Sequence, residues 1–198
     1  MNTYENIALF DMDGTLFDHD LKLREGLDKI KGPNDPLYTL PLTDESPEYL
    51  KQRSYVIRAK KEWWANLPKF QLGWDVFEIA QDLEFKIKIL TQCPKRNPDA
   101  LSGKKECINT HLGYDFDITL TRNKGDVFGK VLVDDYPDYI LSWLKWRKRG
   151  LVIMPANEGN KNFKHSQVIR YDGSNLDQVK EAMKKAKERK PSEFVDYK

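Results

Sequence analysis

Short apolar runs that recur along the chain, separated by helix-like segments, constrain the fold of this sequence most. The runs are residues 7–10, 87–90, 118–120, 131–133 and 151–154. They are short and mostly made of residues that favour strands, which is typical of parallel strands that are covered on both faces. Helical spacing marks residues 74–83, 98–112 and 139–149, and a last helix is expected from Ser174 to about Lys190. This alternation predicts an α/β fold, a three-layer sandwich around a parallel sheet.

The segment between the first two runs departs from this alternation. Residues 21–30 have helical spacing, whereas GPNDPLYTLPLTDE (32–45) is rich in Pro and Asp and predicts a loop. Ser46 as N-cap and Pro47 at the first helical position then predict one long helix that ends before Pro68. We therefore expect residues 1–16 and 71–198 to form the core, and residues 17–70 to form a small, mainly helical cap over the end of the first strand.

Polar side chains follow four of the predicted strands. In chain order they are Asp11 and Asp13, then Thr91 and Gln92, then Lys124, then Asp134 and Asp135. The carboxyl ends of parallel strands meet at one edge of the sheet, where ligands bind. Carboxylates held close together need a cation, and hard oxygen ligands suit Mg²⁺. A lysine and a threonine hydroxyl beside that metal suit a phosphate, so the residues indicate a magnesium-assisted phosphate site.

These motifs, in this order, resemble those of the haloacid dehalogenase-like hydrolases. DMDGT (11–15) is similar to the first signature of that superfamily, DxDx(T/V), and VLVDDYPD (131–138) is similar to its paired-aspartate motif. Within the superfamily, ILTQCP, TLTRNK and LVDDYPD are most similar to the 5′(3′)-deoxyribonucleotidases. The resemblance covers residues 7 to about 154. It implies a Rossmann-like core, with the helical insert as a cap of the superfamily's first type.

The resemblance also implies the chemistry of the two acids in DMDGT. Asp11 would be the nucleophile, which forms an aspartyl-phosphate. Asp13 would be the acid and base, which protonates the leaving group and then activates water. Gly14 would let the backbone turn tightly near the phosphate.

The other motif residues would bind the metal and the phosphoryl group. The ligands of Mg²⁺ would be Asp11, the main-chain carbonyl of Asp13 and Asp134. Asp135 would either bind the metal directly or contact the residues that do. The phosphoryl oxygens would be held by Thr91, Gln92 and Lys124. Lys124 would also offset the negative charge gathered around Asp11.

The substrate implied by the resemblance is a small phosphomonoester, a deoxynucleoside monophosphate, which is hydrolysed to nucleoside and phosphate. The core motifs address only the phosphoryl group, so we expect the cap to bind the nucleoside through Phe17, Trp63 or Trp64. The plainer interpretation of the two tryptophans is that they pack the cap helix on its neighbour. Adjacent helical residues point about 100° apart, however, which leaves one of them free to stack on a base.

Other functions stay open at this point. The same chemistry could act on a sugar phosphate or on the phosphorylated end of a nucleic acid, and Gln92, Cys93 and Tyr136 depart from the family pattern in ways that bear on the substrate. A phosphotransferase such as a mutase is a second alternative, against which the acid and base at Asp13 argues. A binding module without catalysis, which keeps only the phosphate and metal site, is a third.

Composition and charge bear on partners and compartment. The net charge is +2, which argues against a strong nucleic-acid or membrane field. No apolar run is long enough to span a bilayer, and the N-terminus lacks the pattern of a secretory signal. Cys93 and Cys107 are too few for a disulfide framework and indicate reduced thiols. We therefore expect a cytoplasmic protein with a small-molecule substrate.

Overall fold

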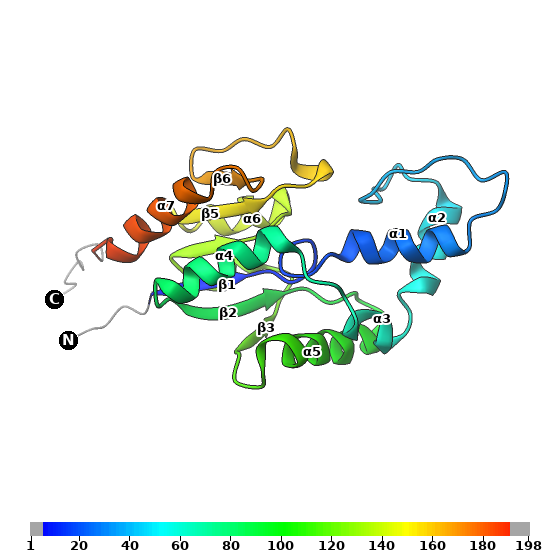
Figure 1. The fold of residues 1–198 in the computed structure, drawn as a ribbon, viewed down its shortest axis with the longest axis horizontal. Coiled ribbons are helices and arrows are strands. Elements are labelled where there is room, and N and C mark those ends of the chain that lie inside the picture. The colour runs from blue at the N-terminus through cyan, green and yellow to red at the C-terminus, as the bar shows by residue number, and fades with distance from the viewer. Residues whose placement is uncertain (1–5, 191–198) are drawn as a thin grey trace.

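A single parallel sheet forms the centre of the molecule in the computed structural model, which describes residues 6–190 (Figure 1). The order of its six strands is β3-β2-β1-β4-β5-β6. They are β1 (Ile7–Phe10), β2 (Lys86–Thr91), β3 (Ile118–Leu120), β4 (Val131–Val133), β5 (Leu151–Pro155) and β6 (Val168–Tyr171). The five predicted strands are confirmed. β6 was not predicted, because this edge strand is only partly buried and lacks a continuous apolar run.

Helices cover both faces of the sheet and complete the predicted three layers. Side chains of β1 alternate between the faces: Ala8 and Phe10 enter one apolar cluster, and Ile7 and Leu9 enter the other. The first cluster is closed by α4 (Gln71–Asp82), α5 (Pro98–Leu112) and α7 (Leu176–Glu188). The second is closed by α6 (Pro137–Leu144). The α/β sandwich inferred from the apolar runs is therefore confirmed.

Two helix boundaries in the second half of the chain differ from the predicted ones. The helix expected at residues 139–149 ends at Leu144, after which short turns carry the chain to Gly150. The last helix has Asn175 as its N-cap rather than Ser174. Ser174 instead donates from its amide and its hydroxyl to the Asp172 carboxylate, at 3.0 and 2.6 Å. This local turn competes with a helix cap at the serine.

The single long helix predicted between Ser46 and Pro68 is wrong. The structure has two helices there, α2 (Glu48–Ile57) and α3 (Lys61–Ala65), preceded by α1 (His19–Lys29). The helix breaks after Arg58, whose carbonyl accepts from the side chains of Trp64 and Asn97, both at 2.8 Å, and not from a following amide. Ser46 lies in a turn, where its hydroxyl accepts from the amide of Thr43.

The insert, residues 17–70, divides into two parts by its packing. α1 and α2 lie beyond the carboxyl end of β1 and share a small apolar cluster with the loop between them (Figure 1); its buried members are Leu23, Leu27, Leu40 and Leu50. α3 packs on α5 of the core. A Cβ at Gly103 of α5 would lie 2.6 Å from the Cβ of Trp64, so only glycine permits this close approach. The cap is thus joined to the core through α3, and its limits at residues 17–70 stay a prediction.

The described part of the chain has no helix with the length and apolar character needed to cross a bilayer.

Candidate active site

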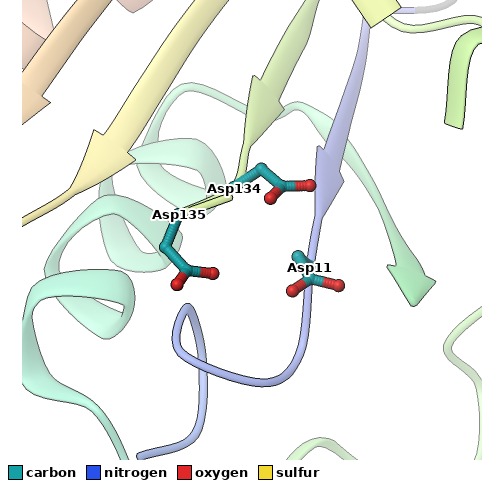
Figure 2. Close-up of side chains that lie close together, drawn as sticks. All are labelled: Asp11, Asp134 and Asp135. Carbon is teal, nitrogen blue, oxygen red and sulfur yellow. The ribbon is translucent and has the colours of Figure 1, made fainter. Parts of the chain in front are cut away.

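Three aspartates from two strand ends converge at one edge of the sheet (Figure 2). One carboxylate oxygen from each of Asp11, Asp134 and Asp135 lies within 4.8 Å of the other two. Asp11 follows β1 and the other two follow β4, and the amide of Asp11 donates to Val133 at 2.9 Å. The strand order reverses between β1 and β4, because β2 and β3 lie on one side of β1 and β4 to β6 on the other. Ligands of open α/β sheets bind at such a switch point.

Lys124 forms ion pairs with two of these aspartates. Its ammonium lies 2.7 Å from Asp11 Oδ1 and 2.6 Å from Asp134 Oδ2, and its side chain has no exposed surface. Burial opposes the charge, but Asp11 and Asp134 together raise the pKa of Lys124, so it stays protonated. The lysine opens a short 3₁₀ turn (Lys124–Asp126) that Asn123 caps. The structure therefore places it where it offsets the charge of Asp11, and its contact with a phosphoryl group stays a prediction.

The protein offsets the negative charges of the two aspartates after β4 only in part. Burial raises the pKa of Asp134 to about 6, although Lys124 and the amide of Tyr136 oppose this. Burial, together with the charges of Asp134 and Asp11, raises the pKa of Asp135 well above its ordinary range. Three carboxylates at this spacing, with one lysine, fit a hard divalent cation, which would favour their ionised forms.

The loop after β1 is shaped by the neighbouring Asp135 and curls beside it (Figure 2). Gly14 has a φ of +73°, and a Cβ there would lie 2.5 Å from Asp135 Oδ2. Both facts require glycine in DMDGT. Asp135 also accepts from Asn157 Nδ2 at 2.8 Å and from the Thr15 hydroxyl at 3.3 Å. Asp135 of the paired-aspartate motif thus contacts both Gly14 and Thr15 of DMDGT.

A second buried lysine, Lys104 of α5, belongs to the site and was missed from the sequence. It is 2% exposed and lies 2.6 Å from Asp13 Oδ2, whose side chain is 27% exposed. It also donates to Thr91 Oγ1 at 3.1 Å and to the main-chain oxygen of Gln92. The sequence held a signal: Ala100, Cys107 and Ile108 are buried, so helical spacing puts Lys104 on the inner face of α5.

Thr91 is the last residue of β2 and Gln92 follows it, and both contact this lysine. Thr91 is buried, and the side-chain oxygen of Gln92 is buried with no hydrogen-bond partner in residues 6–190. Their roles in holding a phosphoryl group stay predictions. The neighbouring Cys93 is partly buried, and burial raises the pKa of its thiol, which disfavours the reactive thiolate.

The aromatic residues expected to bind a nucleoside lie in different surroundings. Phe17 has no exposed surface, because its ring packs against Trp74 and His111 in the core. Trp64 is 2% exposed, and its indole N–H donates to Arg58. Trp63 is partly exposed, packs on both the core and the insert, and meets His19 edge-on at 5.2 Å between ring centroids. Of the three, Trp63 alone retains surface for a ligand.

Comparison with solved structures supports the architecture. No protein-family model matches the chain, and no curated protein matches it. Among similar solved structures, a protein described as a haloacid dehalogenase-like hydrolase from Burkholderia xenovorans has a TM-score of 0.50 and 13% identity, and the alignment covers 89% of this chain and 95% of that one. A protein described as a beta-phosphoglucomutase from Thermotoga maritima has a TM-score of 0.51 and 14% identity, with 91% of this chain and 99% of that one covered. A HAD hydrolase of family IA, variant 3, from Entamoeba histolytica has a TM-score of 0.50 and 14% identity, with 93% of this chain and 100% of that one covered.

Identities of 13–14% establish likeness of fold rather than of activity. The alignments cover 89–93% of this chain and 95–100% of the other chains. The sheet order, the strand-end aspartates and these three structures lead to one conclusion: the chain has the fold of the haloacid dehalogenase-like hydrolases.

Proposed function

We propose that this protein is a Mg²⁺-dependent phosphomonoesterase that works through an aspartyl-phosphate at Asp11. The observation that carries the proposal is the convergence of Asp11, Asp134 and Asp135 within 4.8 Å, with Lys124 bridging Asp11 and Asp134. In this arrangement the Asp11 carboxylate pairs with a buried ammonium beside a cation site. A carboxylate held in this way can attack phosphorus, provided that the charge of the phosphate is neutralised.

The proposed reaction has two steps. In the first, an oxygen of Asp11 bonds to phosphorus while the bond from phosphorus to the leaving oxygen breaks, and Asp13 gives that oxygen a proton. In the second, Asp13 takes a proton from water, the water oxygen bonds to phosphorus, and the bond to Asp11 breaks. The products are an alcohol and inorganic phosphate, and both aspartates return to their starting states. Thr91 and Gln92 orient the phosphoryl oxygens.

The metal fits the residues that would hold it. Asp11, Asp134 and Asp135 would be its ligands from this chain, and the Asp13 carbonyl is a further proposed ligand. When bound, Mg²⁺ supplies positive charge that neutralises phosphoryl oxygens and restores the ionised forms of the buried aspartates.

The finer proposal is that the substrate is a deoxynucleoside monophosphate, as in the 5′(3′)-deoxyribonucleotidases. It is supported by the motifs in ILTQCP, TLTRNK and LVDDYPD, and by the partly exposed indole of Trp63 in the insert. A partly exposed aromatic side chain in the insert can offer a stacking surface to a planar base.

Phosphate release assays test both levels of the proposal. Wild-type protein with Mg²⁺ is expected to hydrolyse nitrophenyl phosphate, and Asp11→Asn is expected to lose nearly all of this activity. A panel of ribo- and deoxyribonucleoside monophosphates, sugar phosphates and 5′-phosphorylated oligonucleotides then identifies the substrate class. Activity on nitrophenyl phosphate with none on any nucleotide would refute the nucleotidase and keep the phosphatase. No hydrolysis of any phosphomonoester would refute both.

A further inference from the structure

We infer that Lys104 is a positioning residue for the proposed hydrolysis, one that leaves Asp13 Oδ1 free for proton transfer and makes the Thr91 hydroxyl a donor. The inference rests on the proposed function. It concerns a cation additional to Lys124, on a different element and in contact with different motif residues. Lys124 contacts Asp11 and Asp134, whereas Lys104 contacts Asp13 and Thr91.

The hydrogen bonds of Lys104 account for all three of its protons. An ammonium has three donors and no acceptor. Its three acceptors are Asp13 Oδ2 at 2.6 Å, Thr91 Oγ1 at 3.1 Å and the main-chain oxygen of Gln92. No donor is left for a phosphoryl oxygen while these bonds persist. Lys104 therefore acts through its neighbours and is not itself a phosphate ligand in this arrangement.

The two carboxylate oxygens of Asp13 are made unequal by this contact. Oδ2 accepts from Lys104, while Oδ1 is buried and has no hydrogen-bond partner among the described residues. An unpartnered buried carboxylate oxygen is costly unless a ligand completes it. The geometry points to Oδ1 as the oxygen that gives the proton to the leaving group and takes it from water. Lys104 prevents the carboxylate from rotating Oδ1 away.

The direction of hydrogen bonding at Thr91 is fixed in the same way. Because an ammonium cannot accept, the Thr91 hydroxyl must be the acceptor in its contact with Lys104. Its own hydrogen is then available to donate elsewhere. A phosphoryl oxygen, which only accepts, is the complementary partner. A free threonine hydroxyl could point either way, so Lys104 removes that ambiguity.

The fold keeps Lys104 in place from the side of the insert. The Trp64 ring lies over the ammonium, with its centroid at 5.2 Å, and Gly103 lets α3 approach α5 at this point. The next residue, Lys105, is exposed and supplies a matched control on the same helix. A lysine that only balances buried charge would serve the fold without setting which oxygen of Asp13 reacts, and this difference can be measured.

The kinetic test is Lys104→Met, which keeps the length of the side chain and removes the donors, with Lys105→Met as control. General acid–base catalysis contributes about 10²- to 10⁴-fold, and we expect loss of orientation to forfeit about ten- to a hundred-fold of it in kcat on an alkyl phosphate. The loss on nitrophenyl phosphate, which has a good leaving group, is expected to be smaller. In an Asp13→Asn background, Lys104→Met is expected to change alkyl phosphate hydrolysis less than about three-fold. Equal losses on both substrates, or full losses in the Asp13→Asn background, would overturn the inference.

Crystal structures of the wild-type protein and Lys104→Met give a test that needs no activity. We expect Oδ2 of Asp13 to contact Lys104 in the wild type, and the Asp13 and Thr91 side chains to rotate in the variant. Unchanged rotamers in the variant would refute the positioning role, even if no phosphomonoester is hydrolysed and the proposed function itself fails. If Lys104→Met alone does not fold, the Lys104→Met/Asp13→Asn double variant removes the uncompensated carboxylate, and the rotamer of Thr91 then decides.

Discussion

Replacing Asp134 by asparagine should stabilise the metal-free protein at neutral pH. Asp134 has no exposed surface, and its pKa is raised by burial from an ordinary value of 3.8 to about 6. The folded state therefore binds more protons than the unfolded state between these values. Stability falls as the pH rises through this window and the full cost is present above it. The difference between the two pKa values corresponds to about 3 kcal/mol in the free energy of unfolding.

The asparagine variant does not ionise and so avoids this cost. In urea unfolding without Mg²⁺, we expect the free energy of unfolding of Asp134→Asn to exceed that of the wild type by up to about 3 kcal/mol at pH 7.5. The gap should narrow toward pH 4 and close below it, where Asp134 becomes protonated in both the folded and the unfolded state. Mg²⁺ should close this gap at pH 7.5 and then reverse it as its concentration rises, because a ligand adds about 2.7 kcal/mol to the wild type at 100 times its Kd and about 4.1 kcal/mol at 1,000 times. Parallel pH profiles for the two proteins, or equal stabilisation of both by Mg²⁺, would refute the reasoning.

Three further predictions follow from single contacts. Gly103→Ala should destabilise the protein by about 1–3 kcal/mol in urea unfolding, since a Cβ there would lie 2.4 Å from the main-chain oxygen of Lys61 and 2.6 Å from the Cβ of Trp64; unchanged stability would contradict this steric account. Lys124→Met should cost about 3–5 kcal/mol because it leaves Asp11 and Asp134 buried without a cation; a change of less than about 1 kcal/mol would contradict this ion-pair account. Trp63→Ala should weaken hydrolysis of a deoxynucleoside monophosphate by about five- to a hundred-fold and leave nitrophenyl phosphate nearly unaffected, and equal effects on both would remove Trp63 from base recognition.

The strand-end residues were predictable because topology alone brings them together. Asp11, Asp134 and Asp135 each directly follow or lie just after a short apolar run, and parallel strands align their carboxyl ends at one edge. No side-chain detail was needed to expect that they meet. Lys124 was also placed correctly near the site, but its position between Asp11 and Asp134 depends on a 3₁₀ turn that no apolar pattern marks.

Lys104 and the broken helix were not predicted because both depend on contacts between distant segments. Lys104 looks like a surface residue in GKKE, and although its helical spacing puts it on the inner face of α5, its contacts with Asp13 and Thr91 depend on how distant segments pack. The helix α2 ends at Ile57, and the carbonyl of the following Arg58 accepts from the side chains of Trp64 and Asn97. Phe17 shows the opposite error: its position after DMDGT suggested a ligand contact, but the turn directs its ring into the core.

The central claim, that Asp11 is phosphorylated during turnover, can be tested by trapping the intermediate. Protein mixed with Mg²⁺ and a phosphomonoester is treated with borohydride, which delivers two hydrides to an acyl phosphate. The first releases phosphate and leaves an aldehyde, and the second reduces the aldehyde to the alcohol, which converts the aspartate to homoserine. Peptide mass spectrometry is expected to find homoserine at position 11 only when substrate is present, and at neither Asp13 nor Asp134. Rapid phosphate release with an unmodified Asp11, or modification at another aspartate, would contradict the account.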